Sequence, residues 1–286
     1  ASDVYKRQGL SFDETAKFYT MPDGMQFVEI GDKVRDLLPK NSNEIHSSLN
    51  VYVTIRNGND ILWLGLFLES CVNIEHSYYV DFNISVTYMS AYRGDKRFLK
   101  NGSQSLFTYL SSLYSVVTQT CYNKSLQFQC PHALLDSDKN REDLFFRLCH
   151  EKFASKESKT IVVFPDAGAK KRFKTDYSSV EFHKKREPTT GSITTKMPYE
   201  TVRKCKRNKR FLIVDDICDG GATFNNIANL ILEKNLDAYI GLAVYHGLFS
   251  KGIDAIHPGI KEIYCTDSTN LEITHPKLTI FNIARK

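Results

Sequence analysis

Residues 211–223 contain several residue types that can bind ligands or take part in catalysis, closely spaced in the sequence. They read Phe-Leu-Ile-Val-Asp-Asp-Ile-Cys-Asp-Gly-Gly-Ala-Thr, so four apolar residues lead into two carboxylates, and a third carboxylate, two glycines and a threonine follow. Backbone N–H groups in a glycine turn that opens a helix bind anions such as phosphate. Carboxylates repel phosphate but suit sugar hydroxyls or Mg²⁺. The segment therefore predicts a sugar-phosphate site, and the alternative is a turn whose acids merely cap a helix.

A strand and a helix must position these residues. The apolar run 211–214 predicts a strand, which places Asp215 and Asp216 at its carboxyl end, where open α/β sheets bind their ligands. The helix is predicted over 223–234, because one helical face then carries apolar residues at Phe224, Ile227, Ala228 and Ile231.

Apolar strand-like runs alternate with helical patterns along most of the chain. Strands are predicted at 49–55, 79–89, 126–130, 160–164, 178–183, 211–214, 238–245, 261–266 and 278–283, and helices at 59–72, 103–119, 141–153 and 223–234. This alternation predicts α/β layers with mostly parallel sheets flanked by helices. Residues 185–196 are rich in Thr, Ser, Gly and Pro, which predicts a mobile loop.

Composition limits the classes of function. The 286 residues suffice for one large domain or two medium ones. The longest apolar run, 61–68, is too short to span a bilayer, and no secretory signal is recognised. Seven cysteines without a C-x-x-C pair indicate reduced thiols and a cytoplasmic location.

The basic residues cluster at 170–174, 184–186 and 203–210, and the net charge is +5. No recognised nucleic-acid motif accompanies them, so we expect neither nucleic-acid nor membrane binding. Anionic phosphate substrates account for the first two clusters, and the third is expected to be solvated surface.

The segment 211–223 resembles the phosphoribosyl-binding signature of type I phosphoribosyltransferases and ribose-phosphate pyrophosphokinases. Further segments are similar to the pyrophosphokinase family in the same order, namely 21–30, 88–95, 130–132, 164–168, 183–186 and 245–250. The likeness runs from about residue 18 to residue 283. It implies two tandem type I phosphoribosyltransferase-like domains.

The resemblance also implies domain boundaries. We expect an ATP-side domain over 9–139, to which residues 275–286 return with the last strand, and a ribose 5-phosphate-side domain over 140–274. Residues 1–8 resemble a translated adapter. Family members place a strand and a helix before the segment matched by 21–24, so we expect this chain to be clipped at its front.

The implied activity is ribose-phosphate diphosphokinase, a transferase of nucleotide biosynthesis that makes phosphoribosyl pyrophosphate and AMP from ATP and ribose 5-phosphate. By residue matches, Lys184 and Arg186 would close over the reacting phosphates as catalytic residues; the alternative is a solvated basic loop. Asp215 and Asp216 would hold the ribose. The 5-phosphate would lie on Asp219, Gly220, Gly221, Ala222 and Thr223.

The resemblance also implies an ATP side. Its contacts would be Asp23, Arg93, Asp95 and His132, with Mg²⁺ bound by His132 and Asp166. The alternatives are a turn residue at 23, a surface charge pair at 93 and 95, and a structural histidine at 132. His246 is expected to be structural. The family also implies a homo-oligomer, a dimer or hexamer, in which a neighbour completes the ATP site.

The sequence departs from the family pattern mainly on the ATP side. Cys130 stands where the family has an aspartate, Gly94 replaces a glutamine and Met25 replaces a glutamate. A thiol cannot replace a carboxylate beside hard Mg²⁺. In the signature, Gly220 replaces a threonine and Ala222 a glycine. Two alternatives to the active enzyme therefore stay open, a type I phosphoribosyltransferase and a non-catalytic regulatory homologue.

Overall fold

A computed structural model describes residues 16–20, 25–38, 47–74, 80–93, 105–130, 139–154, 159–173, 175–186 and 193–285. The chain divides into two units, residues 1–138 with 285–286 and residues 139–284. Most of the expected strands and helices occur within two residues of their predicted ends. In the described part of the chain, no helix is long and apolar enough to cross a membrane.

The second unit is built on a six-stranded sheet in the order β13-β12-β11-β10-β6-β7, and all its strand pairs are parallel. Its strands are β6 (Thr160–Phe164), β7 (Ser179–Glu181), β10 (Arg210–Cys218), β11 (Tyr239–Gly247), β12 (Ile260–Thr266) and β13 (Leu278–Phe281). Its helices are α5 (Lys139–Phe153), α6 (Ala167–Arg172), α7 (Tyr199–Arg207) and α8 (Ala222–Leu232). Short 3₁₀ turns η3 (Ile253–Ala255) and η4 (Asp267–Thr269) follow β11 and β12.

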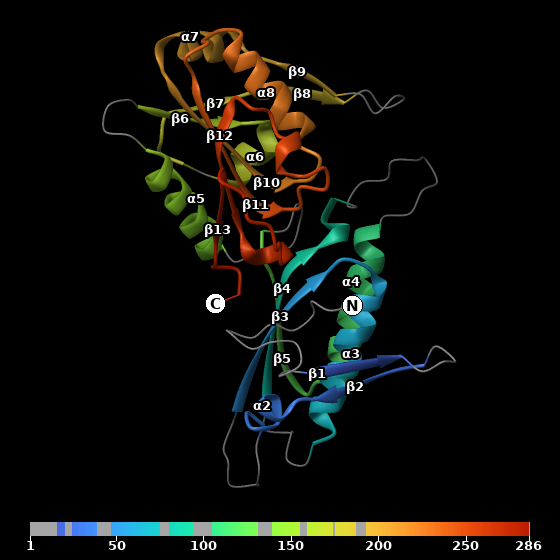
Figure 1. Ribbon diagram of the computed structural model, residues 1–286. Coiled ribbons are helices and arrows are strands. Elements are labelled where there is room, and N and C mark those ends of the chain that lie inside the picture. The colour runs from blue at the N-terminus through green and yellow to red at the C-terminus, as the bar shows by residue number, and fades with distance from the viewer. Residues whose placement is uncertain are drawn as a thin grey trace. The chain divides into compact units, whose positions relative to one another are not determined.

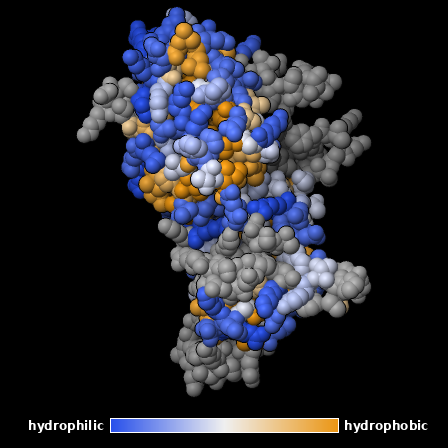
Figure 2. Space-filling model, viewed as in Figure 1, coloured by the Kyte–Doolittle hydropathy of each residue, from blue (hydrophilic) through white to orange (hydrophobic). Residues whose placement is uncertain are grey.

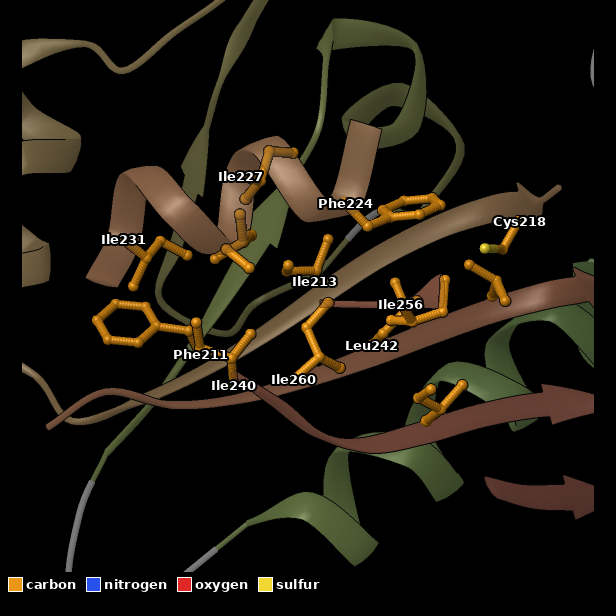
Figure 3. Close-up of a cluster of buried hydrophobic side chains, with 14 of the residues drawn as sticks. Phe211, Ile213, Cys218, Phe224, Ile227, Ile231, Ile240, Leu242, Ile256 and Ile260 are labelled. Carbon is orange, nitrogen blue, oxygen red and sulfur yellow. The ribbon is translucent and has the colours of Figure 1, made fainter. Parts of the chain in front are cut away.

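Helices cover both faces of this sheet, with α5 and α8 on opposite sides (Figure 1). Successive residues of a strand face opposite sides of the sheet. Since both sides are covered, all four residues of the apolar run 211–214 are fully buried. Phe211 and Ile213 pack beneath α8 together with Ile227 and Ile231 (Figure 3). The continuous apolar runs that predicted strands are thus explained by burial on both faces.

Two expectations for the second unit were wrong. The last strand was expected to return to the first unit, but β13 pairs with β12 in the six-stranded sheet, because Leu278 and Ile280 pack on its core; only residues 285–286 group with the first unit. Residues 185–196 were expected to be a loop. Instead β8 (His183–Arg186) and β9 (Ile193–Lys196) form an antiparallel hairpin, in which Ile193 and two threonines favour a strand.

The outer surface of the second unit is mixed. Hydrophilic side chains dominate the face that carries β13, and apolar patches interrupt them (Figure 2). All four residues of β13 are half-buried, as expected for a strand at the edge of a sheet. All seven cysteines of the chain are buried.

The first unit holds a three-stranded parallel sheet, β3 (Ser47–Ile55), β4 (Val80–Met89) and β5 (Asn123–Phe128). Its helices are α2 (Asp32–Arg35), α3 (Gly58–Val72) and α4 (Ser105–Thr120), with the 3₁₀ turn η2 (Ser90–Arg93). A hairpin of β1 (Ala16–Thr20) and β2 (Gln26–Ile30) packs on α3. Helix α3 begins with a capping box, because Asn57 and Asp60 accept hydrogen bonds from each other's first-turn backbone.

Candidate functional site

The second sheet changes its winding direction between β6 and β10. From β6 the chain goes to β7 on one side, whereas from β10 it proceeds through β11 and β12 on the other. Ligands of open α/β sheets bind outside the carboxyl ends of the strands at such a switch point. Asp166 follows β6, and Asp215 and Asp216 lie near the end of β10. The topology therefore brings together acids that are about fifty residues apart in sequence.

Strand β10 continues four residues beyond the predicted end, so the acid pair lies within the strand. The two side chains differ in exposure, 14% for Asp215 and 1% for Asp216. The Asp216 N–H donates to Asp215 Oδ1 at 2.9 Å. This bond fixes the first carboxylate against the backbone of the second, so the pair has a defined geometry at the end of the strand.

Arg172, the last residue of α6, neutralises part of the acid pair. Its Nη1 lies 3.2 Å from Asp216 Oδ1 and 3.8 Å from Asp215 Oδ1, and its side chain is 11% exposed. A buried carboxylate needs such a partner, since an unpaired charge is costly to bury. The basic cluster 170–174 contained this residue, but its partner could be identified only once β6 and β10 were known to be neighbours.

Burial raises the pKa of Asp215 well above its ordinary value. The neighbouring Asp216 carboxylate raises it further by charge repulsion and by a side-chain hydrogen bond, and the field of Asp166 adds to this. The hydrogen bond from the Asp216 N–H acts in the opposite direction. A raised carboxyl pKa in a partly open position is typical of functional sites.

The turn 219–223 joins β10 to α8 in a conformation that only glycine adopts readily. Gly221, the N-cap of α8, has φ 78°, and a Cβ there would lie 2.4 Å from Ile256 Cδ1. Gly221 caps α8 without a side-chain hydrogen bond, and the N-terminus of a helix suits an anion. Asp219 and Ala222 are exposed, which leaves the turn accessible.

Asp166 caps α6 by accepting a hydrogen bond from the Ala169 N–H at 3.0 Å. Asp166 therefore has a structural role at the start of α6. Within the described residues, no group of three His, Cys, Asp or Glu side chains could hold a metal ion. His246 is buried, and its Nδ1 lies 2.8 Å from Ser268 Oγ, in agreement with a structural role.

The remaining predicted site residues are only partly described. Lys184 and Arg186 lie on β8, opposite Thr195 and Ile193 of β9, but their side chains are outside the described part. Arg93 ends the 3₁₀ turn η2 and its side chain is likewise outside it. Asp23, Asp95 and His132 lie outside the described residues altogether.

Comparisons with known proteins relate this geometry to one family. No family model matches the chain. A segment of 82 residues is 39% identical to a ribose-phosphate pyrophosphokinase of Mycoplasmopsis pulmonis (strain UAB CTIP), and it covers 27% of this chain and 25% of that protein. The match therefore spans about a quarter of the length of the curated relative.

The fold matches more broadly than the sequence. A crystal structure of phosphoribosylpyrophosphate synthetase from Mycobacterium smegmatis superposes with a TM-score of 0.64 at 16% identity, covering 95% of this chain and 87% of that one. The chain thus resembles the ribose-phosphate pyrophosphokinase family, as its motifs predicted. The predicted fold class, α/β with mostly parallel sheets flanked by helices in a phosphoribosyltransferase-like arrangement, is confirmed.

Proposed function

We propose that this chain transfers diphosphate from ATP to the 1-hydroxyl of ribose 5-phosphate, giving phosphoribosyl pyrophosphate and AMP. The observation that carries the proposal is the acid pair Asp215 and Asp216 at the carboxyl end of β10, next to a glycine turn that opens α8. Carboxylates accept hydrogen bonds from sugar hydroxyls, and the N–H groups of the turn suit phosphate. The resemblance to pyrophosphokinases supports the same assignment.

In this proposal the second unit holds the sugar phosphate. The 5-phosphate lies on residues 219–223, and Asp215 and Asp216 orient the ribose hydroxyls. The anomeric oxygen then attacks the β-phosphorus of ATP, the bond from this phosphorus to the oxygen shared with the α-phosphate breaks, and AMP leaves. Such a transfer depends on positioning and on neutralising charge, which is the role proposed for Lys184 and Arg186.

The proposed cofactor is Mg²⁺. Hard oxygen donors fit this ion, and the carboxylate of Asp166 at the switch point is such a donor. When bound, Mg²⁺ would neutralise charge on the polyphosphate. Asp166 and His132 remain the proposed metal-binding residues, and Asp23, Arg93, Asp95 and His132 the proposed ATP contacts.

Cys130 favours a second candidate, a homologue that binds ligand without turnover. It occupies the place of a family aspartate, it is fully buried, and its φ of 41° is unusual for a residue other than glycine. A buried thiol offers hard Mg²⁺ a poor ligand. In either case we propose that the chain forms a homo-oligomer in the cytoplasm. Its proposed ligands are ATP and ribose 5-phosphate, and we propose no binding of nucleic acid.

The decisive experiment incubates the full chain with ATP, Mg²⁺ and ribose 5-phosphate and follows AMP release. The proposal expects AMP in proportion to phosphoribosyl pyrophosphate, and it expects Asp219→Ala to abolish this activity. Asp237→Ala is a matched control, because Asp237 is exposed at the other end of the sheet.

Each other result contradicts the proposal in a different way. Binding of ribose 5-phosphate without AMP release would identify the non-catalytic homologue. Pyrophosphate release that depends on an added base would identify a phosphoribosyltransferase. Activity retained in Asp219→Ala would refute the assignment of the turn.

A further inference from the structure

A second loop lies beside the turn 219–223 at the carboxyl ends of β10 and β11. The N–H groups of Leu248 and Phe249 donate to the carbonyl oxygen of Cys218 at 2.8 and 3.2 Å. Phe249 has φ 45° and Gly252 has φ 81°, and the Gly252 N–H closes the loop on the Phe249 carbonyl at 2.8 Å. The loop 248–252 is therefore held in one conformation next to the last residue of β10.

Lys251, in this loop, lies along Gly220. A Cβ built at Gly220 would be 3.3 Å from Lys251 Cε, 3.4 Å from Cδ and 3.7 Å from Cγ, so three methylene groups of the lysine follow the glycine. Lys251 is exposed. Within the described part of the chain, its ammonium takes part in no ion pair or hydrogen bond. Its charge is thus available to a ligand on the turn.

The negative charges around the turn favour a role for the Lys251 ammonium. Three carboxylates lie close in sequence, at 215, 216 and 219, and Arg172 is already engaged by the first two. A phosphomonoester brings a further charge of about −1.5 to −2 near neutral pH. Backbone N–H groups supply only partial positive charge, so a phosphate on the exposed turn needs an additional full positive charge against Asp219.

The glycine at position 220 makes room for the lysine. The family signature carries a threonine at this position, and its Cβ would meet the Lys251 stem at the tight distance of 3.3 Å. Gly220 is not among the glycines with positive φ, so its backbone does not require glycine. With glycine at position 220, the Lys251 stem can lie there without the shift of a few tenths of an ångström that a Cβ would require.

We propose that Lys251 binds the phosphate of a phosphomonoester held on the turn 219–223, and that Gly220 exists in this chain to admit it. The exchange replaces a hydroxyl donor of the signature by a cation from the neighbouring loop. The inference rests on the proposed function of the turn as a sugar-phosphate site.

The test titrates ribose 5-phosphate, inorganic phosphate and ribose into the full chain by calorimetry. Lys251→Met should weaken binding of ribose 5-phosphate about tenfold or more, as expected for loss of a hydrogen bond to a charged group, and should leave ribose unaffected. Lys251→Arg should restore much of the affinity. Lys261→Met is the matched control, since Lys261 is the second residue of β12, at the opposite end of the sheet, and its ammonium donates to the Pro258 carbonyl.

The outcomes separate the two proposals. Equal affinity of wild type and Lys251→Met for ribose 5-phosphate would overturn the role of Lys251 and leave the proposed function standing. If the folded wild type binds no ribose 5-phosphate, the sugar-phosphate site is wrong and the inference falls with it. Circular dichroism and the thermal midpoint of each variant confirm that it is folded.

A double-mutant cycle tests the role of Gly220. Gly220→Thr should weaken ribose 5-phosphate binding in the wild type, because the new Cβ displaces the lysine stem, and should have little effect in the Lys251→Met background. Strictly additive losses in the double variant would refute the coupling between the two positions.

Discussion

The two units of the chain carry parallel sheets of different kinds. In β10 every residue from 211 to 214 is fully buried, whereas along β4 buried residues alternate with half-buried ones up to Val86. The half-buried side of β4 is polar, since Asn83 Nδ2 donates to Ser48 Oγ at 2.7 Å and Asn83 Oδ1 accepts from Ser125 Oγ at 2.8 Å. In the described residues, only the second sheet is apolar on both faces.

This difference explains why the second unit supports the functional assignment. A strand fixed on both faces presents Asp215 and Asp216 with little freedom, and the turn and Arg172 are held beside them. The matched residues of the first unit lie after its strands, where side chains are outside the described part or depart from the family, as Cys130 does. The proposed sugar-phosphate site is therefore better supported than the proposed nucleotide site.

The largest expected difference between the units comes from the buried acid. Asp216→Ala removes the nearer of the two carboxylates beside the nearly buried guanidinium of Arg172 and leaves Asp215 at 3.8 Å, so we expect a loss of about 3–5 kcal/mol in the free energy of unfolding. Asp81→Asn, on the half-buried side of β4, should cost less than about 1 kcal/mol. Urea unfolding measures both. Equal losses would contradict the contrast between the sheets.

Adjacent core residues test burial on both faces. Leu212→Ala and Ile213→Ala should each cost about 2–5 kcal/mol, because both side chains are fully buried on opposite faces of β10. In β4, Ile84→Ala should cost a similar amount but Asn83→Ala only about 1 kcal/mol. A small loss for either β10 variant in chemical unfolding would show that one face is less well packed than described.

The turn should respond to a single methyl group. Gly221→Ala places a Cβ at φ 78° and against Ile256, and the left-handed conformation alone costs about 1–2 kcal/mol. We expect weaker binding of ribose 5-phosphate together with reduced stability. Gly58→Ala in the first unit is the control, because a Cβ there meets nothing within 4 Å. Unchanged binding by Gly221→Ala would remove the turn from the site.

The smallest expected effect is a pH dependence. The pKa of Asp215 is raised in the folded state, so the folded chain binds its proton more tightly than the unfolded chain does. The stabilisation by this group is then fully present below its unfolded pKa of about 3.9 and is lost as the pH rises through the folded pKa. Asp215→Asn should therefore gain stability relative to wild type as the pH rises above about 4. If the difference in unfolding free energy between wild type and Asp215→Asn did not change with pH, the raised pKa of Asp215 would be contradicted.

Much of the fold could be predicted from hydrophobic periodicity. The run 211–214 and the helical stripe at 224, 227 and 231 become strand β10 and helix α8, because burial on defined faces imposes those patterns. Residues 193–196 were misassigned because a short hairpin has no such periodicity beside its Ser, Gly and Thr neighbours. The last strand was misplaced because its sheet partner is set by long-range packing.

The candidate site could be predicted only in part. Three acids and two glycines at short spacing indicated the turn. Arg172 and Lys251, in contrast, lie 43 and 36 residues away from Asp215 in the sequence. Their proximity follows from the order of β6, β10 and β11 in the sheet. No local pattern could state that order.

Calorimetric titration of the folded full chain with ribose 5-phosphate tests the central claim most directly. The account predicts saturable binding that ribose alone does not reproduce and that Gly221→Ala weakens. Absence of heat at saturating ribose 5-phosphate, with the chain folded by circular dichroism, would contradict the assignment of the acid pair and turn as a sugar-phosphate site.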